Sequence, residues 1–121
     1  MYQLWQDLQS GSACQYFSRT TGIDYSQLYP RLEVISDSGE FYLAPHHDHL
    51  EKRLSVMVYT DHQQLWPGTT ITGVGAVESR DNRAFFFVPS EDTVHEYPKT
   101  NFTSVRRCLQ INYWTYEVDR P

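Results

Sequence analysis

The stretch Ser104-Val105-Arg106-Arg107-Cys108-Leu109-Gln110-Ile111-Asn112-Tyr113-Trp114-Thr115-Tyr116 decides the fold of this chain. It predicts the longest β-strand of the protein. Because alternate side chains of a strand leave opposite faces, a polar set shares one face: Arg106, Cys108, Gln110 and Asn112. A mostly apolar set shares the other face: Arg107, Leu109, Ile111 and Tyr113. We expect the polar face to line a binding cavity and the apolar face to lie beneath N-terminal helices.

Shorter strands are predicted upstream, separated by turn signals. They cover residues 32–35, 41–44, 53–60, 71–77, 84–88 and 94–97. Residues 37–40 predict a turn between the first two, and the Gly-interrupted strand at 71–77 is weak. The continuous apolar run at 84–88 predicts a buried strand.

The N-terminal part of the chain predicts helices up to about Leu28. Ser12 and Gln15 form a candidate capping box, and Gly22 would end that helix. Residues 66–70 predict a loop. We expect one mainly β domain over residues 1–121, with a helical lead at 1–29 and a jelly-roll core at 30–116, its short helices packed on one sheet.

Composition excludes several classes of protein. The 121 residues carry a net charge of -5 and no Lys/Arg cluster, which argues against a duplex nucleic-acid partner. The two cysteines, Cys14 and Cys108, are too few for a disulfide scaffold, and reduced thiols in a cytoplasmic protein are the simpler interpretation. No apolar stretch approaches the roughly 20 residues that span a bilayer, and no signal peptide is visible, so no membrane association is expected.

The run Pro45-His46-His47-Asp48-His49, followed far downstream by His95, predicts a metal centre. On a strand, His46 and Asp48 would leave the same face. A third ligand from His95 would place two imidazoles and one carboxylate on one side of a metal. This set holds non-haem Fe(II) and leaves other coordination positions open for a cosubstrate and dioxygen.

Alternatives remain open for the ligands and for the cation near them. His47 and His49 are also two residues apart and could contact the metal in place of solvent. Taken singly, His46 or His95 would be an ordinary hydrogen-bonded histidine. A register slip of one residue would bring Arg107 into the position of Arg106, because it turns every side chain over.

Four motifs in order, His46-x-Asp48, Tyr59, His95 and Arg106-x-Cys108-Leu109, resemble the Fe(II)- and 2-oxoglutarate-dependent oxygenases, in the branch near the prolyl hydroxylases. Residues 87–95 look like the strand, loop and histidine of that branch, and residues 106–115 like its Arg-x-Ser-Leu strand. The resemblance covers roughly residues 30 to 115. It implies a double-stranded β-helix, also called a cupin-like jelly roll.

The resemblance also implies a role for each matched residue. His46, Asp48 and His95 would bind iron, while Arg106 and Tyr59 would bind the distal carboxylate of 2-oxoglutarate. A guanidinium offers two parallel donors to a carboxylate, which suits this role. Cys108 stands where the family has a serine that helps to hold the cosubstrate, and a thiol is a weaker donor.

The expected activity is that of a dioxygenase of the hydroxylase type. Asp48 favours hydroxylation, because related halogenases have a small residue in its place. Gln110, Asn112 and Trp114 follow Arg106 on the same face and are candidates for the substrate pocket. The expected substrate is a small metabolite, a sugar derivative or a peptide side chain. The alternative function is a non-catalytic jelly-roll module that binds a metal.

Overall fold

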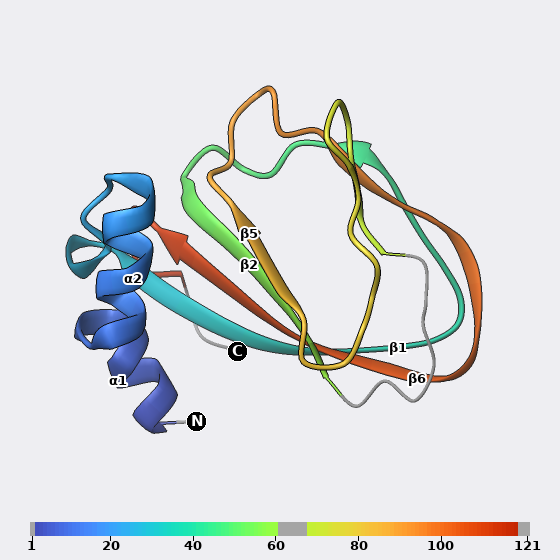
Figure 1. Cartoon of the computed structure of the whole chain (residues 1–121), viewed down its shortest axis with the longest axis horizontal. Helices are drawn as coiled ribbons and strands as arrows, with labels where there is room; N and C mark the ends of the chain where they lie inside the picture. The colour runs from blue at the N-terminus through green and yellow to red at the C-terminus, as the bar shows by residue number, and fades with distance from the viewer. Residues whose placement is uncertain (1, 61–67, 119–121) are drawn as a thin grey trace.

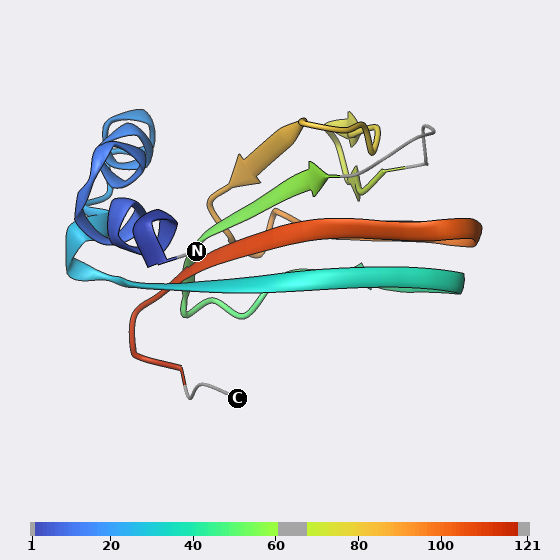
Figure 2. The ribbon, with the colours of Figure 1, turned by 90° about the horizontal axis from the view of Figure 1, so that it is seen from below.

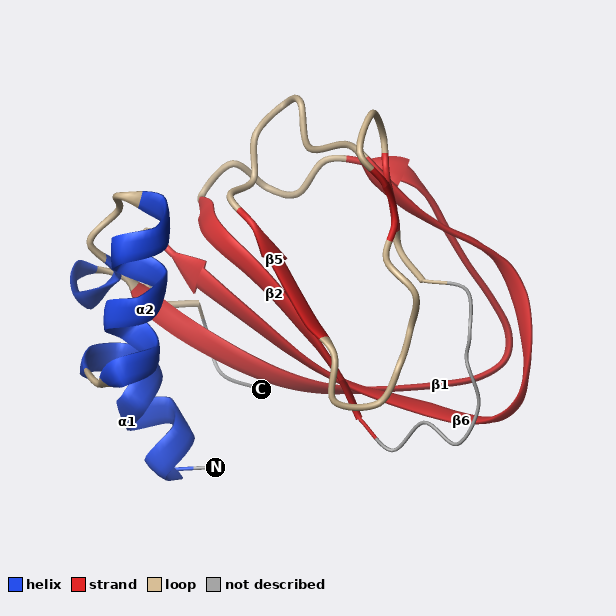
Figure 3. Cartoon of the chain, viewed as in Figure 1, coloured by secondary structure: helices blue, strands red, loops and turns tan. Residues whose placement is uncertain are grey.

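The computed structural model describes residues 2–60 and 68–118 and is mainly β, as predicted. Two helices, α1 (Tyr2–Ser10) and α2 (Ser12–Thr21), and a short 3-10 helix, η1 (Tyr25–Gln27), precede the strands. The strands are β1 (Tyr29–His46), β2 (Lys52–Thr60), β3 (Thr70–Ile71), β4 (Gly75–Ala76), β5 (Ala84–Phe87) and β6 (His95–Trp114). Figure 3 shows the helices together at one end of the strands.

The strands form one curled antiparallel sheet in which β6 is central. The order is β4-β3-β6-β2-β5, and β1 also pairs with β6. The pairing of β1 with β6 runs from Tyr29 opposite Trp114 to His46 opposite His95. The last part of β6 also pairs with β2, and its first residues pair with β3. Figures 1 and 2 show the long β1–β6 ribbon extending away from the helices and bending at its far end.

Strand β6 folds back on itself. The ring centroid of Tyr97, near its start, lies 4.5 Å from the guanidinium carbon of Arg106. A straight strand would place these two residues about 30 Å apart. The bend therefore puts the two halves of β6 on opposite sides of one interior.

The turn predicted at residues 37–40 is wrong. Strand β1 continues through these residues, with shifts of register between Asp37 and Gly39 and again near Phe41. Gly39 has φ 65, which bends the strand locally without reversing it. The chain stays extended because β6 offers a pairing partner on both sides of the irregularity.

Other boundaries also differ from the predicted ones. The short strand predicted at 94–97 is the beginning of β6, and the strand predicted at 71–77 is a small hairpin of β3 and β4. Strand β5 has the predicted place but is only half-buried, since it lies at an end of the strand order. Of the loop predicted at 66–70, residues 66 and 67 lie outside the described residues.

Helix α2 begins at a different cap from the one predicted. Its N-cap is Gly11, and the carboxylate of Asp7 accepts hydrogen bonds from the backbone N–H groups of Ser12 (2.8 Å) and Ala13 (3.2 Å). A Cβ on Gly11 would lie 2.2 Å from Asp7 Oδ1, so the close approach requires glycine. Gly22 ends the helix in the left-handed conformation, as predicted. In the described part of the chain, no helix has the length and apolar character needed to cross a membrane.

The core confirms the predicted parity of β6. Ile111 and Tyr113 are buried against the helices and β2, in a cluster with Leu8, Cys14, Tyr25, Leu54 and Val56. On the opposite face Arg106, Cys108 and Asn112 are buried inside the curled sheet. The helices therefore cover one face of the sheet, and the polar face of β6 is turned to the interior.

We expect Tyr113→Phe to lower the free energy of unfolding by about 1–3 kcal/mol. The Tyr113 hydroxyl donates to the carbonyl of Leu8, in the last turn of α1, where helical carbonyls lack an intrahelical partner. Both residues are buried, so the carbonyl would lose its donor. Urea denaturation measures the change. Tyr16→Phe, the same change at an exposed position of α2, is the control and should alter stability by less than about 0.5 kcal/mol.

Candidate metal centre

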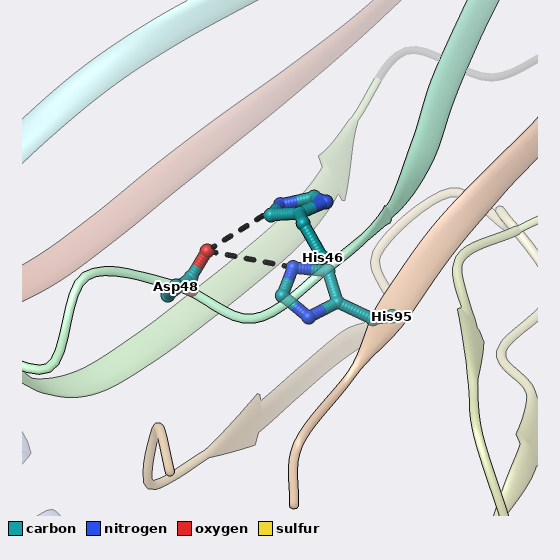
Figure 4. Close-up of side chains that lie close together, drawn as sticks. All are labelled: His46, Asp48 and His95. Carbon is teal, nitrogen blue, oxygen red and sulfur yellow. Dashed lines mark ion pairs between the residues drawn. The ribbon is translucent and has the colours of Figure 1, made fainter. Parts of the chain in front are cut away.

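The β1–β6 pairing places two of the predicted ligands next to each other. His46 is the last residue of β1 and lies opposite His95, the first residue of β6. Asp48 follows in the loop between β1 and β2, not on the strand itself as the two-residue spacing suggested. The loop turns its side chain back toward the two imidazoles, as Figure 4 shows.

The three side chains present one ligand atom each to a common point. Nε2 of His46 lies 3.7 Å and Nε2 of His95 3.5 Å from Oδ1 of Asp48. All three ligand atoms lie within 4.8 Å of one another. Ligands at about 2.1 Å from a metal and at right angles to each other would be about 3 Å apart. Closing this group around one ion would therefore bring the ligand atoms closer together by at most about 1.8 Å.

Backbone carbonyls fix the tautomer of both histidines. Nδ1 of His46 lies 2.8 Å from the carbonyl oxygen of Ala44, and Nδ1 of His95 lies 2.9 Å from that of Thr93. A carbonyl only accepts, so Nδ1 carries the proton in each ring. The lone pair of each neutral imidazole is then on Nε2, the atom that points to Asp48. Such outer hydrogen bonds orient the ligands of protein metal sites.

The carboxylate of Asp48 is held and kept ionised. Ser55, on β2, donates its hydroxyl to Oδ2 at 2.7 Å, which leaves Oδ1 toward the histidines. Burial opposes ionisation, but hydrogen bonds from His95 and Ser55 and the charge of Lys52 outweigh it and lower the pKa of Asp48 to about 2. The carboxylate is therefore an anion over the whole range in which histidine titrates.

The two histidines differ in their surroundings. The hydrogen bond to Asp48 raises the pKa of His95, so without a metal this ring holds a second proton more readily. Metal binding at Nε2 would displace that proton. The side chain of His46 is 37% exposed, against 9% for His95. The group of three is therefore open to solvent on the His46 side.

The structure does not place His47 or His49 with the ligands. Both are exposed, and neither belongs to the metal-binding group found among the described residues. Nδ1 of His49 accepts from the backbone N–H of Glu51 at 3.1 Å, and its ring lies 5.8 Å from that of Trp114. The two rings therefore make other contacts than with the three candidate ligand side chains.

Arg106 faces the interior and Arg107 is exposed, so the predicted register is confirmed. The guanidinium of Arg106 already has a carboxylate partner that the sequence analysis did not predict. Its Nη2 and Nε donate to Oδ2 of Asp37 at 2.5 and 3.1 Å. Asp37 lies directly opposite Arg106 in the β1–β6 pairing, a position hidden by the predicted turn.

Tyr59 and Cys108 lie beside Arg106, as the resemblance implies. They are opposite each other on β2 and β6, and both are buried. The Tyr59 ring centroid is 5.9 Å from the Arg106 guanidinium carbon. Burial raises the pKa of the Cys108 thiol to about 11, so the thiol is neutral at physiological pH. The structure thus gathers the three predicted cosubstrate residues in one place.

The candidate substrate residues follow Arg106 on the same face of β6. One of them pairs with a residue that contacts the metal group, as we call His46, Asp48 and His95. Asn112 lies opposite Ser55, the residue that holds Asp48. Asn112 Oδ1 and Trp114 Nε1 are buried and find no hydrogen-bond partner in the described part of the chain. Gln110, half-buried, is opposite Met57. Of these three residues, Asn112 is therefore the one whose strand partner contacts Asp48.

A separate hollow of about 380 Å³ lies where β1 and β6 bend. Its lining contains none of the predicted site residues and is formed by Glu40, Phe41, Tyr42, Lys99, Thr100 and Asn101.

Neither a comparison with protein-family models nor one with curated protein sequences finds a match. A function for this chain must therefore be inferred from the chemistry of its own side chains.

We expect the protein to bind one divalent metal ion per chain and His95→Ala to weaken binding at least about 100-fold, because one of three ligands is lost. Isothermal titration with Ni(II) or Zn(II) measures the affinity, since both ions bind such ligands at least as strongly as Fe(II). His49→Ala is the matched control and should bind as the wild type does. An equal loss in both variants would contradict the assignment of His95.

Ser55→Ala should weaken metal binding about 10- to 100-fold, the usual effect of removing a hydrogen bond to a metal ligand. The variant keeps all three ligands but frees Oδ2 of Asp48, so the carboxylate is no longer fixed in orientation. The same titration tests it. Unchanged affinity would show that the loop alone positions Asp48.

Proposed function

We propose that this chain is an Fe(II)- and 2-oxoglutarate-dependent oxygenase of the double-stranded β-helix fold. The observation that carries the proposal is the convergence of two imidazole Nε2 atoms and one carboxylate oxygen on a common point, with both Nδ1 atoms held by backbone carbonyls. Two nitrogens and one oxygen on one side of the metal leave its other positions free, which is the arrangement that Fe(II) oxygenases use.

The topology supports the same proposal. The first half of β1 and the second half of β6 continue into a layer with β2 and β5. The remaining halves of β1 and β6 continue into a second layer with β3 and β4. Two layers of four strand segments, joined by strands that pass from one to the other, are typical of jelly rolls and cupins.

Each residue has a defined task under this proposal. Asp48 would occupy the ligand position that a small residue leaves open to chloride in related halogenases, so hydroxylation is the expected reaction. Arg106, with Tyr59, recognises a carboxylate by charge and paired donors. Fe(II) and 2-oxoglutarate, when bound, supply the oxidation of a substrate C–H bond by dioxygen, with 2-oxoglutarate converted to succinate and carbon dioxide.

The chemistry beside the metal group suggests a polar substrate. The amides of Gln110 and Asn112 and the indole N–H of Trp114 can hydrogen-bond to hydroxyl or amide groups. A small metabolite, a sugar derivative or a peptide side chain fits this set better than duplex nucleic acid, given the net charge of -5. Cys14 and Cys108 are both free, as a reducing cytoplasm would keep them.

One observation favours the second candidate, a metal-binding module without catalysis. The donors of Arg106 are directed to Asp37, so a cosubstrate carboxylate would meet an arginine that is already neutralised. A chain that only bound a metal would need no free cation near it.

We expect the protein loaded with Fe(II) to develop a weak visible absorption band when 2-oxoglutarate is added without oxygen. With oxygen, it should convert 2-oxoglutarate slowly to succinate even without the true substrate. Asp48→Ala should abolish succinate formation because the metal loses its carboxylate ligand. His47→Ala, one residue away and exposed, is the control. Wild-type protein that binds Fe(II) but neither binds 2-oxoglutarate nor forms succinate would favour the non-catalytic module.

A further inference from the structure

Among the ion pairs of the described residues outside the metal group, that of Arg106 and Asp37 is the shortest and the most buried. Their side chains are 4% and 8% exposed. Four aromatic rings have their centroids between 4.5 and 5.9 Å from the guanidinium carbon, those of Phe41, Tyr59, Tyr97 and Phe102. The pair therefore lies in surroundings of low polarity, where charge interactions are much stronger than in water.

Asp37 binds Arg106 through a carboxylate, the same chemical group through which a dicarboxylic cosubstrate would bind it. Nε and Nη2 of Arg106, which form one edge of its donor fork, both donate to Oδ2 of Asp37. The fork is thus shown to hold a carboxylate, and the carboxylate it holds belongs to the chain.

A second carboxylate cannot join the pair without a cost. Arg106 and Asp37 together are neutral, so an added anion would leave one net negative charge among the aromatic rings. Buried charges without a counter-charge are strongly disfavoured. Asp37 and the carboxylate of a ligand must therefore compete for Arg106, whichever edge of the guanidinium the ligand binds.

The backbone near Asp37 is suited to such an exchange. The regular pairing of β1 with β6 is interrupted directly after Asp37, where the register shifts before Gly39. A displacement of Asp37 would therefore not break a continuous ladder on that side. Glu33, which precedes Asp37 on β1, has no such role, since it forms a partly exposed ion pair with Arg31 at 3.0 Å.

We propose that Asp37 is an internal competitor of the cosubstrate and determines how strongly this site selects a dicarboxylic 2-oxo acid. This inference rests on the proposed function. While Asp37 is paired with Arg106, the distal carboxylate of 2-oxoglutarate adds little to the binding affinity. The site therefore discriminates weakly between 2-oxoglutarate and a 2-oxo acid that lacks the distal carboxylate. Removing the charge of Asp37 makes Arg106 available and restores the discrimination.

The test compares two ligands of equal chain length on the Ni(II)-loaded full chain, by isothermal titration. The ligands are 2-oxoglutarate and 2-oxovalerate, which lacks the distal carboxylate. Asp37→Asn keeps the size of the side chain and should tighten 2-oxoglutarate binding at least about tenfold, as expected for a close charge pair. Binding of 2-oxovalerate should change less than about twofold. Glu33→Gln, which removes a carboxylate paired with the half-buried Arg31, should leave both affinities as in the wild type.

Two other results would overturn the inference and are distinguishable. If both acids bind the wild type and Asp37→Asn leaves 2-oxoglutarate affinity unchanged or weaker, Asp37 is not a competitor, while the proposed function stands. If Ni(II) binds but neither acid binds either protein, the proposed function itself fails, and Asp37 has no cosubstrate to compete with.

A second measurement covers the case in which Asp37→Asn is unstable, because Arg106 loses its buried counter-charge. In metal-free protein, 2-oxoglutarate should raise the Tm of Asp37→Asn by more than it raises that of the wild type. For Asp37→Asn, 2-oxoglutarate should also raise the Tm by more than 2-oxovalerate does. An equal effect of the two acids on the variant would contradict the exchange of carboxylates at Arg106.

Discussion

The apolar core, the polar interior and the metal group are all arranged along the backbone pairing between β1 and β6. It runs from Tyr29 opposite Trp114, beneath the helices, to His46 opposite His95, at the metal group. The core forms on one face of this ribbon and the polar interior on the other, because side chains alternate along each strand. The bend that brings Tyr97 over Arg106 then encloses the polar face. The metal group and the apolar core thus lie at opposite ends of the hydrogen-bonded pairing between β1 and β6.

Inside the curled sheet, each buried charge is matched by a neighbour. Asp48 lies between Ser55 and the two imidazoles, and Arg106 is neutralised by Asp37. The metal group has a carboxylate that stays ionised and two imidazoles whose orientation is held by backbone carbonyls, so little reorientation of the rings is needed to receive a cation. The Arg106 pair is neutral and enclosed by aromatic rings, so it resists any change of charge. We therefore expect the metal group to accept a cation readily and the Arg106 pair to oppose an added anion.

Much of this arrangement could be predicted from short patterns. The alternation along β6 identified Arg106 rather than Arg107 as the inward residue, because a half-buried strand fixes its register through its apolar face. The order of His46, Asp48 and His95 led to the prediction that these side chains come together, and the structure brings them together, although Asp48 lies in a loop and not on the strand. Local patterns worked where the side chains of one strand or one loop decide the outcome.

The errors have a common physical cause, which is that tertiary pairing overrode local preference. Asp37 and Gly39 are typical turn residues, yet β6 keeps them extended. The partner of Arg106 was therefore missed, since Asp37 comes to face it only when the two long strands are in register. In the same way, Asp7 rather than Ser12 caps α2, because the short link through Gly11 brings a carboxylate from the preceding helix. Such partners are set by three-dimensional contacts that no single segment encodes.

The central position of β6 has a consequence for how the protein is assembled. The strand that comes last along the chain pairs with β1, β2 and β3, so among the described strands only β2–β5 and β3–β4 can pair before it is in place. Contacts between residues so distant in sequence form slowly, because loop closure must precede them. During synthesis, His46 and Asp48 leave the ribosome long before His95 does. A divalent ion offered to such a nascent chain would meet two of the three candidate ligands, and the group of three is complete only after the sheet has closed.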